Sequence, residues 1–195
     1  LTDTALVTLA VSSINDAPVL DAILDISFDE GSTKDIDLSA SDADSNEILT
    51  FSIAGGSDIT ADLSGDSITF DSPDDFHGSE SFVVTVTDSG SLSDSQSILV
   101  TVNPVNDAPI LSSIDSQSVD EDNTFTYTLS ANDVDGDALA YSAIASDGSV
   151  SVTGTTLTLI PDQDYNGDIQ IDVTVDDGDL TDFGSFTLTV NPVND

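Results

Sequence analysis

Hydrophobic and polar residues alternate along most of this chain with a period of two. In 169–175, Ile or Val occupies every odd position and Gln, Asp or Thr every even one, and 82–86 follows a matching pattern with Phe and Val. This period is typical of β-strands that bury one face, since successive side chains point to opposite sides of a strand. The other segments that alternate in this way are 36–38, 49–53, 68–70, 98–102, 127–129, 139–143, 157–159 and 186–190.

The predicted strands are short and are separated by segments rich in Gly, Asp, Ser and Pro. A sheet with one apolar face must cover that face with another sheet, so many short strands of this kind favour a β-sandwich. No segment shows the apolar spacing of a helix. The sequence therefore predicts an all-β fold, with two tandem sandwiches of about seven strands each.

The chain contains an internal repeat. Asn-Pro-Val-Asn-Asp occurs at 103–107 and again at 191–195, and a looser copy, Ser-Ser-Ile-Asn-Asp, occurs at 12–16. Three longer segments that contain these copies align without gaps: 1–16, 92–107 and 180–195. Their starting points are separated by 91 residues (92 − 1) and then by 88 residues (180 − 92).

From this repeat we predict two complete domains with their linkers, 17–107 and 108–195. We expect 1–16 to be the last strand and linker of a preceding repeat, preceding the two sandwiches as an orphan strand. Its apolar residues Val7, Leu9 and Val11 align with the closing strand of each later repeat. A strand without the domain that it closes is expected to stay mobile or to add to an available sheet edge.

Composition narrows the classes of function. The chain has 38 acidic residues against a single Lys or Arg, for a formal net charge of −37, and it has no Cys. This charge excludes a nucleic-acid binder and opposes contact with an anionic bilayer, and the lack of Cys excludes disulfides and Cys-ligated zinc. Hydrophobic residues make up 38% of the chain, enough for folded cores. The apolar runs are too short to span a membrane, so we expect a soluble segment of a longer protein.

Nearly all of the acids are Asp, which suits turns and oxygen-rich metal sites. We expect most of them to form a solvated surface. Three groups stand out: an Asp-x-Asp loop at 42–44 and 133–135, the Glu of each repeat's first strand at 30 and 121, and the linker 103–109. Ca²⁺ takes about six to eight oxygen ligands with loose geometry, so loops of this kind are candidates for calcium ligands.

These motifs resemble those of the cadherin family, and more closely the bacterial cadherin-like repeats of large secreted or surface adhesins. The segment 28–32 (Phe-Asp-Glu-Gly-Ser) is similar to the family's first-strand Glu motif. The segment 41–53 is similar to its Asp-x-Asp loop entering the next strand, and 103–109 to its Asn-Asp-Ala-Pro linker. An Asp-(Phe/Tyr)-x-Gly motif, at 75–78 and 164–167, is also typical of the bacterial branch.

The resemblance implies a seven-stranded sandwich with Ca²⁺ held where one domain meets the next. Carried over residue by residue, the ligands at the middle junction are Glu30, Asp75, Asn103, Asn106, Asp107, Asp133, Asp135 and Asp177. Partial sites at the two ends would use Asp16, Asp42, Asp44 and Asp88, and Glu121, Asp164 and Asp195. Asn103 stands where the animal family usually has Asp, and His77 or Asn166 replaces a second acid, so the number of ions per junction stays open between one and three.

Simple electrostatics also favours a bound cation. Two carboxylates about 5 Å apart repel each other by roughly 1 kcal/mol even in water, and more when they are partly buried. Lys34 is the single Lys or Arg of the chain. Protein cations cannot neutralise several acidic loops, so a divalent ion is expected to do so.

The residues offer little for catalysis. The chain has no Cys, and its one His, His77, is replaced by Asn166 in the other repeat. Paired carboxylates of the glycosidase kind occur in any acid-rich chain, but each predicted domain is small and has no aromatic cluster to serve as a sugar platform. We therefore expect a protein that is not an enzyme: a calcium-stiffened extracellular structural and adhesion module at the bacterial cell surface. The alternative is a calcium-dependent module for carbohydrate binding or homophilic contact. The expected partners are adjacent repeats, and polysaccharide or like domains on other cells, without nucleic acid or membrane insertion.

Overall fold

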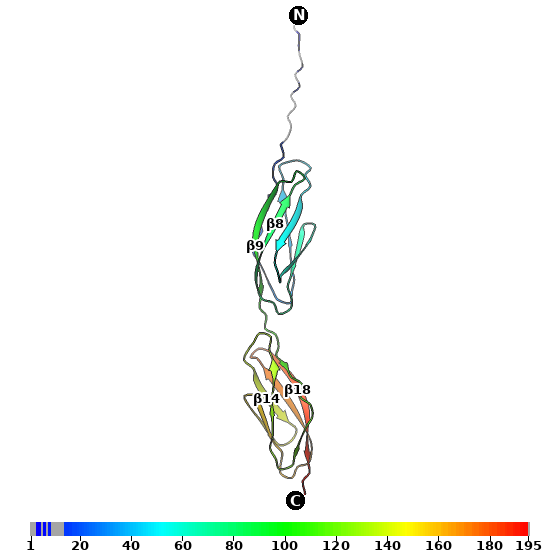
Figure 1. The fold of residues 1–195 in the computed structure, drawn as a ribbon, viewed down its shortest axis with the longest axis vertical. Helices are drawn as coiled ribbons and strands as arrows, with labels where there is room; N and C mark the ends of the chain where they lie inside the picture. Colours follow the sequence, from blue (N-terminus) through cyan, green and yellow to red (C-terminus); the bar gives the residue numbers. More distant parts are fainter. Residues whose placement is uncertain (1–2, 5, 7, 9–13, 195) are drawn as a thin grey trace. The chain divides into compact units, whose positions relative to one another are not determined.

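A computed structural model describes residues 3–4, 6, 8 and 14–194 (Figure 1). The predicted orphan strand cannot be assessed, because Val7, Leu9 and Val11 lie outside the described residues. The described chain consists of strands and loops and contains no helix, which confirms the predicted all-β class. It divides into two compact units, Leu1–Val105 (unit 1) and Asn106–Asp195 (unit 2).

Unit 1 is a sandwich of two sheets. Its four-stranded sheet has the order β2-β9-β8-β5 and its three-stranded sheet the order β3-β7-β6, while β1 and β4 form a short separate pair. β2 runs parallel to β9, and all other pairs are antiparallel. The strands are β1 (Val19–Leu20), β2 (Ile26–Asp29), β3 (Lys34–Asp37), β4 (Ala40–Ser41), β5 (Thr50–Gly55), β6 (Thr60–Ser64), β7 (Ser67–Asp71), β8 (Gly78–Thr87) and β9 (Ser93–Asn103).

Unit 2 repeats this topology strand for strand. Its sheets have the orders β11-β18-β17-β14 and β12-β16-β15, with the short pair β10-β13. The strands are β10 (Ile110–Leu111), β11 (Gln117–Asp120), β12 (Phe125–Thr128), β13 (Ala131–Asn132), β14 (Ala140–Ala145), β15 (Ser149–Thr153), β16 (Thr156–Ile160), β17 (Gly167–Asp176) and β18 (Thr181–Asn191). Each unit therefore has seven strands of four residues or more, together with one two-residue pair.

The alternating positions of the sequence form the core of each unit. In β17, Ile169, Ile171, Val173 and Val175 are all fully buried, and the polar residues between them face outward or are only half-buried. The corresponding buried residues of unit 1 lie on β8 and are Phe82, Val84 and Val86. Burial of each such side chain contributes about 1.5–3 kcal/mol, so these central strands carry much of the stability.

Candidate metal centres

Carboxylates and linker residues meet at one end of each sandwich, in what we call the leading cluster. In unit 2 it contains Asn106, Asp107, Asp133, Asp135, Asp137 and Asp177; in unit 1 it contains Asn15, Asp16, Asp42, Asp44 and Asp88. The linker residues directly precede the first short strand, while the acids lie just after β13 and β17, or β4 and β8. The fold thus brings together segments that are far apart in sequence.

Two hydrogen bonds tie the linker residues of unit 2 to its acids. The Asn106 side-chain amide donates to Asp177 Oδ2 at 3.1 Å, and the Asp107 backbone N–H donates to Asp135 Oδ2 at 2.8 Å. Unit 1 repeats both bonds: Asn15 donates to Asp88 Oδ2 at 2.8 Å, and the Asp16 N–H donates to Asp44 Oδ2 at 2.8 Å. The same bonding in two copies shows that the sequence motif specifies this geometry.

The first Asp of each Asp-x-Asp loop has one satisfied and one unsatisfied oxygen. Asp133 Oδ1 accepts the N–H groups of Gly136 at 3.0 Å and Asp137 at 3.3 Å, whereas its Oδ2 is buried and has no hydrogen-bond partner in the described structure. Asp42 has the same arrangement, with Oδ1 accepting the Asp44 N–H at 2.7 Å and Oδ2 buried and unpartnered. A buried carboxylate oxygen without a partner is costly, and a bound cation would satisfy it.

Three carboxylates of unit 2 converge on one point. Oxygens of Asp133, Asp135 and Asp137 all lie within 4.8 Å of one another. Asp137 was not among the predicted ligands, although the alternating Asp-x-Asp-x-Asp run from 133 to 137 was a signal that could have identified it. At such distances each pair of ionised groups repels by roughly 1 kcal/mol in water, so this group suits a divalent ion that takes only oxygen ligands.

The last acid of the unit 2 leading cluster, Asp177, is held in its ionised form by backbone hydrogen bonds. The pKa of Asp177 is lowered mainly by hydrogen bonds from the backbone N–H groups of Leu180 and Asp179, with a smaller contribution from the Asn106 amide, while burial works in the opposite direction. Both N–H groups donate to Asp177 Oδ1 at 2.7 Å. Its counterpart Asp88 is buried and accepts the Leu92 N–H at 2.8 Å.

A second group, the trailing cluster, lies where the last strand of each unit ends. In unit 1 it contains Glu30, Asn103 and Asp75; in unit 2 it contains Glu121, Asn191 and Asp164. Glu30 Oε1 accepts the Val105 N–H at 2.6 Å, and the Glu30 N–H donates to Asn103 O at 3.0 Å. Glu30 Oε2 is buried without a hydrogen-bond partner among the described residues.

Unit 2 reproduces this pattern. Glu121 is buried, its Oε1 accepts the Val193 N–H at 2.5 Å, and its own N–H donates to Asn191 O at 2.9 Å. The Asp that precedes each Glu orients the Asn side chain of the cluster. The Asn103 amide donates to Asp29 Oδ1 at 3.0 Å, and the Asn191 amide donates to Asp120 Oδ1 at 3.3 Å. Both amide oxygens therefore stay available as ligands.

The Asp of the Asp-(Phe/Tyr)-x-Gly motif lies at the same end of the sandwich as the Glu. Gly78 pairs with Val102 near the end of β9, so the turn that contains Asp75 lies at the same end of the sandwich as Asn103. Asp75 and Asp164 both have positive φ values, 60° and 59°, in tight turns. No hydrogen bond in the described structure joins Asp75 to Glu30, and Asp195 lies outside the described residues.

Two tandem sandwiches of this topology define the class of immunoglobulin-like and cadherin-like repeat proteins. The bacterial Ig domain family matches the chain twice, over residues 15–101 and 106–191. The chain belongs to this family, in two tandem copies, and its cadherin-like tandem repeats are confirmed. No helix in the described part of the chain is long and apolar enough to cross a membrane.

One curated relative is chitinase A of Pseudoalteromonas piscicida, which is 31% identical over 131 residues. This match covers 66% of the chain and 16% of the relative, so the chain spans only a small part of that protein. Among solved structures, human protocadherin-24 repeats EC1-2 are 18% identical with a TM-score of 0.63, covering 92% of this chain and 100% of that one. Human mucin-like protocadherin EC1-2 is 18% identical with a TM-score of 0.53, covering 90% and 98%. Such identities show a shared fold.

Proposed function

We propose that this chain is a calcium-stiffened structural and adhesion module of a larger extracellular bacterial protein, and is not itself an enzyme. The observation that carries the proposal is the repetition of the leading cluster. Both units hold the first Asp of the loop with one oxygen bonded and the other buried without a partner. Two independent copies of a costly arrangement favour a common ligand, and oxygen-only donors fit Ca²⁺.

The chain's own residues prepare the linker for this role. Residues Asn103 and Val105 are bonded to Glu30 of unit 1, and Asn106 and Asp107 are bonded to acids of unit 2. Pro104 further restricts the backbone between them. When bound, Ca²⁺ would neutralise the acids and hold the linker to them, and we propose that this limits the motion of one unit against the other.

In this proposal the ion ligands come from Glu30, Asp75, Asn103, Asn106, Asp107, Asp133, Asp135 and Asp177, to which we now add Asp137. The leading cluster of unit 1, with Asp16, Asp42, Asp44 and Asp88, and the trailing cluster of unit 2, with Glu121 and Asp164, would be weaker partial sites. Each lacks the ligands that a further repeat would supply.

The proposal is tested by calorimetric titration of the chelator-treated protein with CaCl₂. We expect saturable binding with a Kd near about 10⁻⁴–10⁻³ M, as in other extracellular modules. The variant Asp133→Asn should weaken binding, because it removes charge from the buried, unpartnered oxygen. Asp172→Asn is the matched control, since Asp172 is an exposed residue on the outer face of β17. Equal binding by both variants would refute the assignment of Asp133.

The match to chitinase A favours one alternative, a calcium-dependent carbohydrate-binding or homophilic-contact module. A titration with chitin oligosaccharides, with CaCl₂ or with chelator, distinguishes this function from that of a spacer. A spacer should give no saturable heat in either condition. Calcium-dependent binding of the sugar would favour the alternative.

A further inference from the structure

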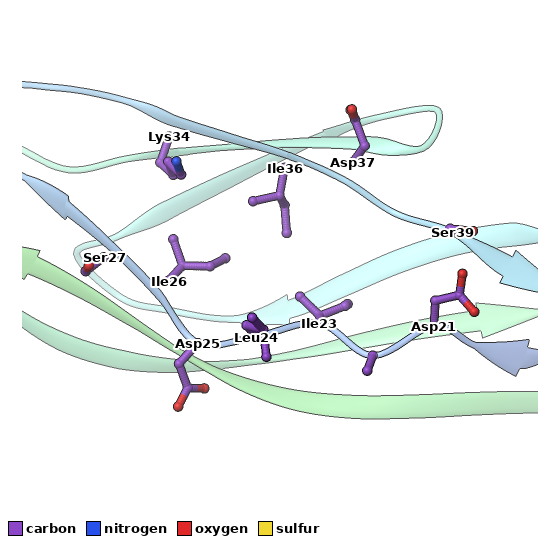
Figure 2. Close-up of a pocket in the computed structure, with 11 residues that line it drawn as sticks. Asp21, Ile23, Leu24, Asp25, Ile26, Ser27, Lys34, Ile36, Asp37 and Ser39 are labelled. Atoms are coloured by element: carbon purple, nitrogen blue, oxygen red, sulfur yellow. The ribbon is translucent and has the colours of Figure 1, made fainter.

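Unit 1 has an open apolar groove between the segment 21–27 and strand β3 (Figure 2). Its volume is about 550 Å³, within the range of pockets that hold ligands. Ile23, Ile26 and Ile36 point into the space between the two segments, and Lys34 lies on the wall (Figure 2). Leu24, which also lines the groove, is 82% exposed. An open apolar groove in a highly charged protein is a candidate interaction site.

The groove is held in shape by hydrogen bonds on both sides of the segment 21–27. The Asp21 N–H donates to Ser39 O at 2.9 Å, and the Ile23 N–H donates to Gln96 Oε1 at 3.1 Å. Asp25 Oδ1 accepts the Leu99 N–H at 2.9 Å, which turns this carboxylate away from the groove. A preformed groove loses little conformational entropy when it binds a partner.

Unit 2 carries aromatic side chains at the corresponding strand positions. Lys34 and Ile36 of β3 correspond to Phe125 and Tyr127 of β12, the first and third residues of each strand. Phe125, Tyr127 and Phe186 form a cluster with ring centroids 6.0–6.4 Å apart. Unit 1 has Lys34 and Ile36 in place of these two rings, so its groove leaves apolar space at strand positions where unit 2 carries aromatic side chains.

Charge determines which kind of partner fits. Asp21 and Asp37 line the groove, against Lys34 as the one cation of a chain with a net charge of −37. A second copy of this chain would bring the same excess of acid to the contact and would be repelled. A positively charged partner would be attracted, and Lys34 could contact the face of an inserted ring.

We propose that this groove binds an extended, positively charged peptide segment of a partner protein, anchored by one aromatic side chain. Strand β3 stands at the edge of its sheet, so its outer backbone groups are available to pair with such a segment. None of the proposed calcium ligands lines the groove. The inference is therefore independent of the proposed function.

The test is an NMR titration of the isotope-labelled 195-residue protein with the peptide Lys-Thr-Tyr-Thr-Lys, acetylated and amidated at its ends. We expect saturable shifts concentrated at residues 21–27 and 34–39. The variant Leu24→Asp should weaken binding at least about tenfold. Its matched control is Ile144→Asp, which places the same charge at a 68% exposed apolar position of unit 2 and should leave binding unchanged.

A second variant keeps the test independent of any effect of added charge at Leu24. Lys34→Phe with Ile36→Tyr restores the two rings of unit 2 and should abolish the shifts in the groove. The acidic peptide Glu-Thr-Tyr-Thr-Glu and the ring-less peptide Lys-Thr-Ala-Thr-Lys should not bind. The proposal would be overturned if either of these peptides bound as tightly as Lys-Thr-Tyr-Thr-Lys. It would also be overturned if the shifts spread over the acidic surface, or if Leu24→Asp bound the peptide as well as the wild type does. Shifts at the groove that depend on protein concentration in the absence of peptide would show that a second copy of the chain binds there. That result would also overturn the proposal.

Discussion

Glu80 tests how a carboxylate on the core-facing side of a strand stabilises unit 1. It lies on β8 at the same face as the core residues Phe82 and Val84, yet it is charged. Its carboxylate accepts four hydrogen bonds from the loop between β5 and β6: from the Ser57 N–H at 2.8 Å, the Ser57 hydroxyl at 2.6 Å, and the N–H groups of Asp58 and Ile59, both at 3.1 Å. This loop also buries the Ile59 side chain in the core.

The loss of stability expected when Glu80 is replaced follows from these hydrogen bonds. An intramolecular hydrogen bond makes a net contribution of about 0.5–1.5 kcal/mol to stability. In a Glu80 variant, water can partly replace the lost acceptor of the loop N–H groups, because the site is only half-buried. We therefore expect Glu80→Ala to lower the free energy of unfolding of unit 1 by about 2–3 kcal/mol. Glu80→Gln keeps an acceptor oxygen and should cost about 1 kcal/mol.

The effect should depend on pH in a defined window. Hydrogen bonding lowers the pKa of Glu80 from 4.5 to about 2, chiefly through the Ser57 hydroxyl, with partial burial working against it. A lowered folded-state pKa contributes stability that is fully present above pH 4.5 and is lost as the pH falls toward 2. The difference between the wild type and Glu80→Gln should therefore shrink across this window.

Urea unfolding followed by NMR separates the two units, so unit 2 serves as an internal reference. Asp62→Asn is the matched control, because it removes one charge from an exposed position of the same unit. We expect only the Glu80 variants to shift the unfolding of unit 1. Equal stability of Glu80→Ala and Asp62→Asn would refute the stabilising role of the Glu80 carboxylate. So would a difference between the wild type and Glu80→Gln that persisted unchanged at pH 2.

Three further substitutions test a proposed calcium ligand, a core residue and a close backbone contact. Asp135→Ala should weaken Ca²⁺ binding measured by calorimetry while leaving the calcium-free melting temperature of unit 2 nearly unchanged, because the residue lies in a loop; unaltered affinity would contradict its role. Val173→Ala should destabilise unit 2 by about 1–3 kcal/mol in urea, with or without Ca²⁺, through lost burial and a cavity. Gly55→Ala should destabilise unit 1 in the same assay, since a Cβ there would lie 2.4 Å from Ser81 O and φ is +129°; wild-type stability would contradict this steric constraint.

Much of the fold could be predicted from the sequence because the core is encoded locally. The alternation at 169–175 directly gives the buried face of β17, and the repeat gives two units of one topology. The Asp-x-Asp loops were equally visible. In unit 2, carboxylate oxygens of Asp133 and Asp135, two residues apart, lie within 4.8 Å of one another.

Features that depend on distant segments could not be predicted from composition or spacing. Glu80 meets Ser57 only because the register of β5 against β8 brings the loop to it. The groove of unit 1 lies between two separate segments, 21–27 and β3, and the sequence alignment of Ile36 with Tyr127 could not show that these segments lie side by side. The bond between Asn106 and Asp177 links residues 71 positions apart, which only a family resemblance could suggest beforehand.

The central claim, that Ca²⁺ stiffens the connection between the units, is tested most directly by pulsed electron paramagnetic resonance. The chain has no Cys, so Ser64→Cys and Ser151→Cys, both at exposed positions, can carry one spin label on each unit. With Ca²⁺ we predict a narrow distribution of distances between the labels, and with chelator a broad one. Distributions of equal width in the two conditions, in a sample that calorimetry shows to bind Ca²⁺, would contradict it.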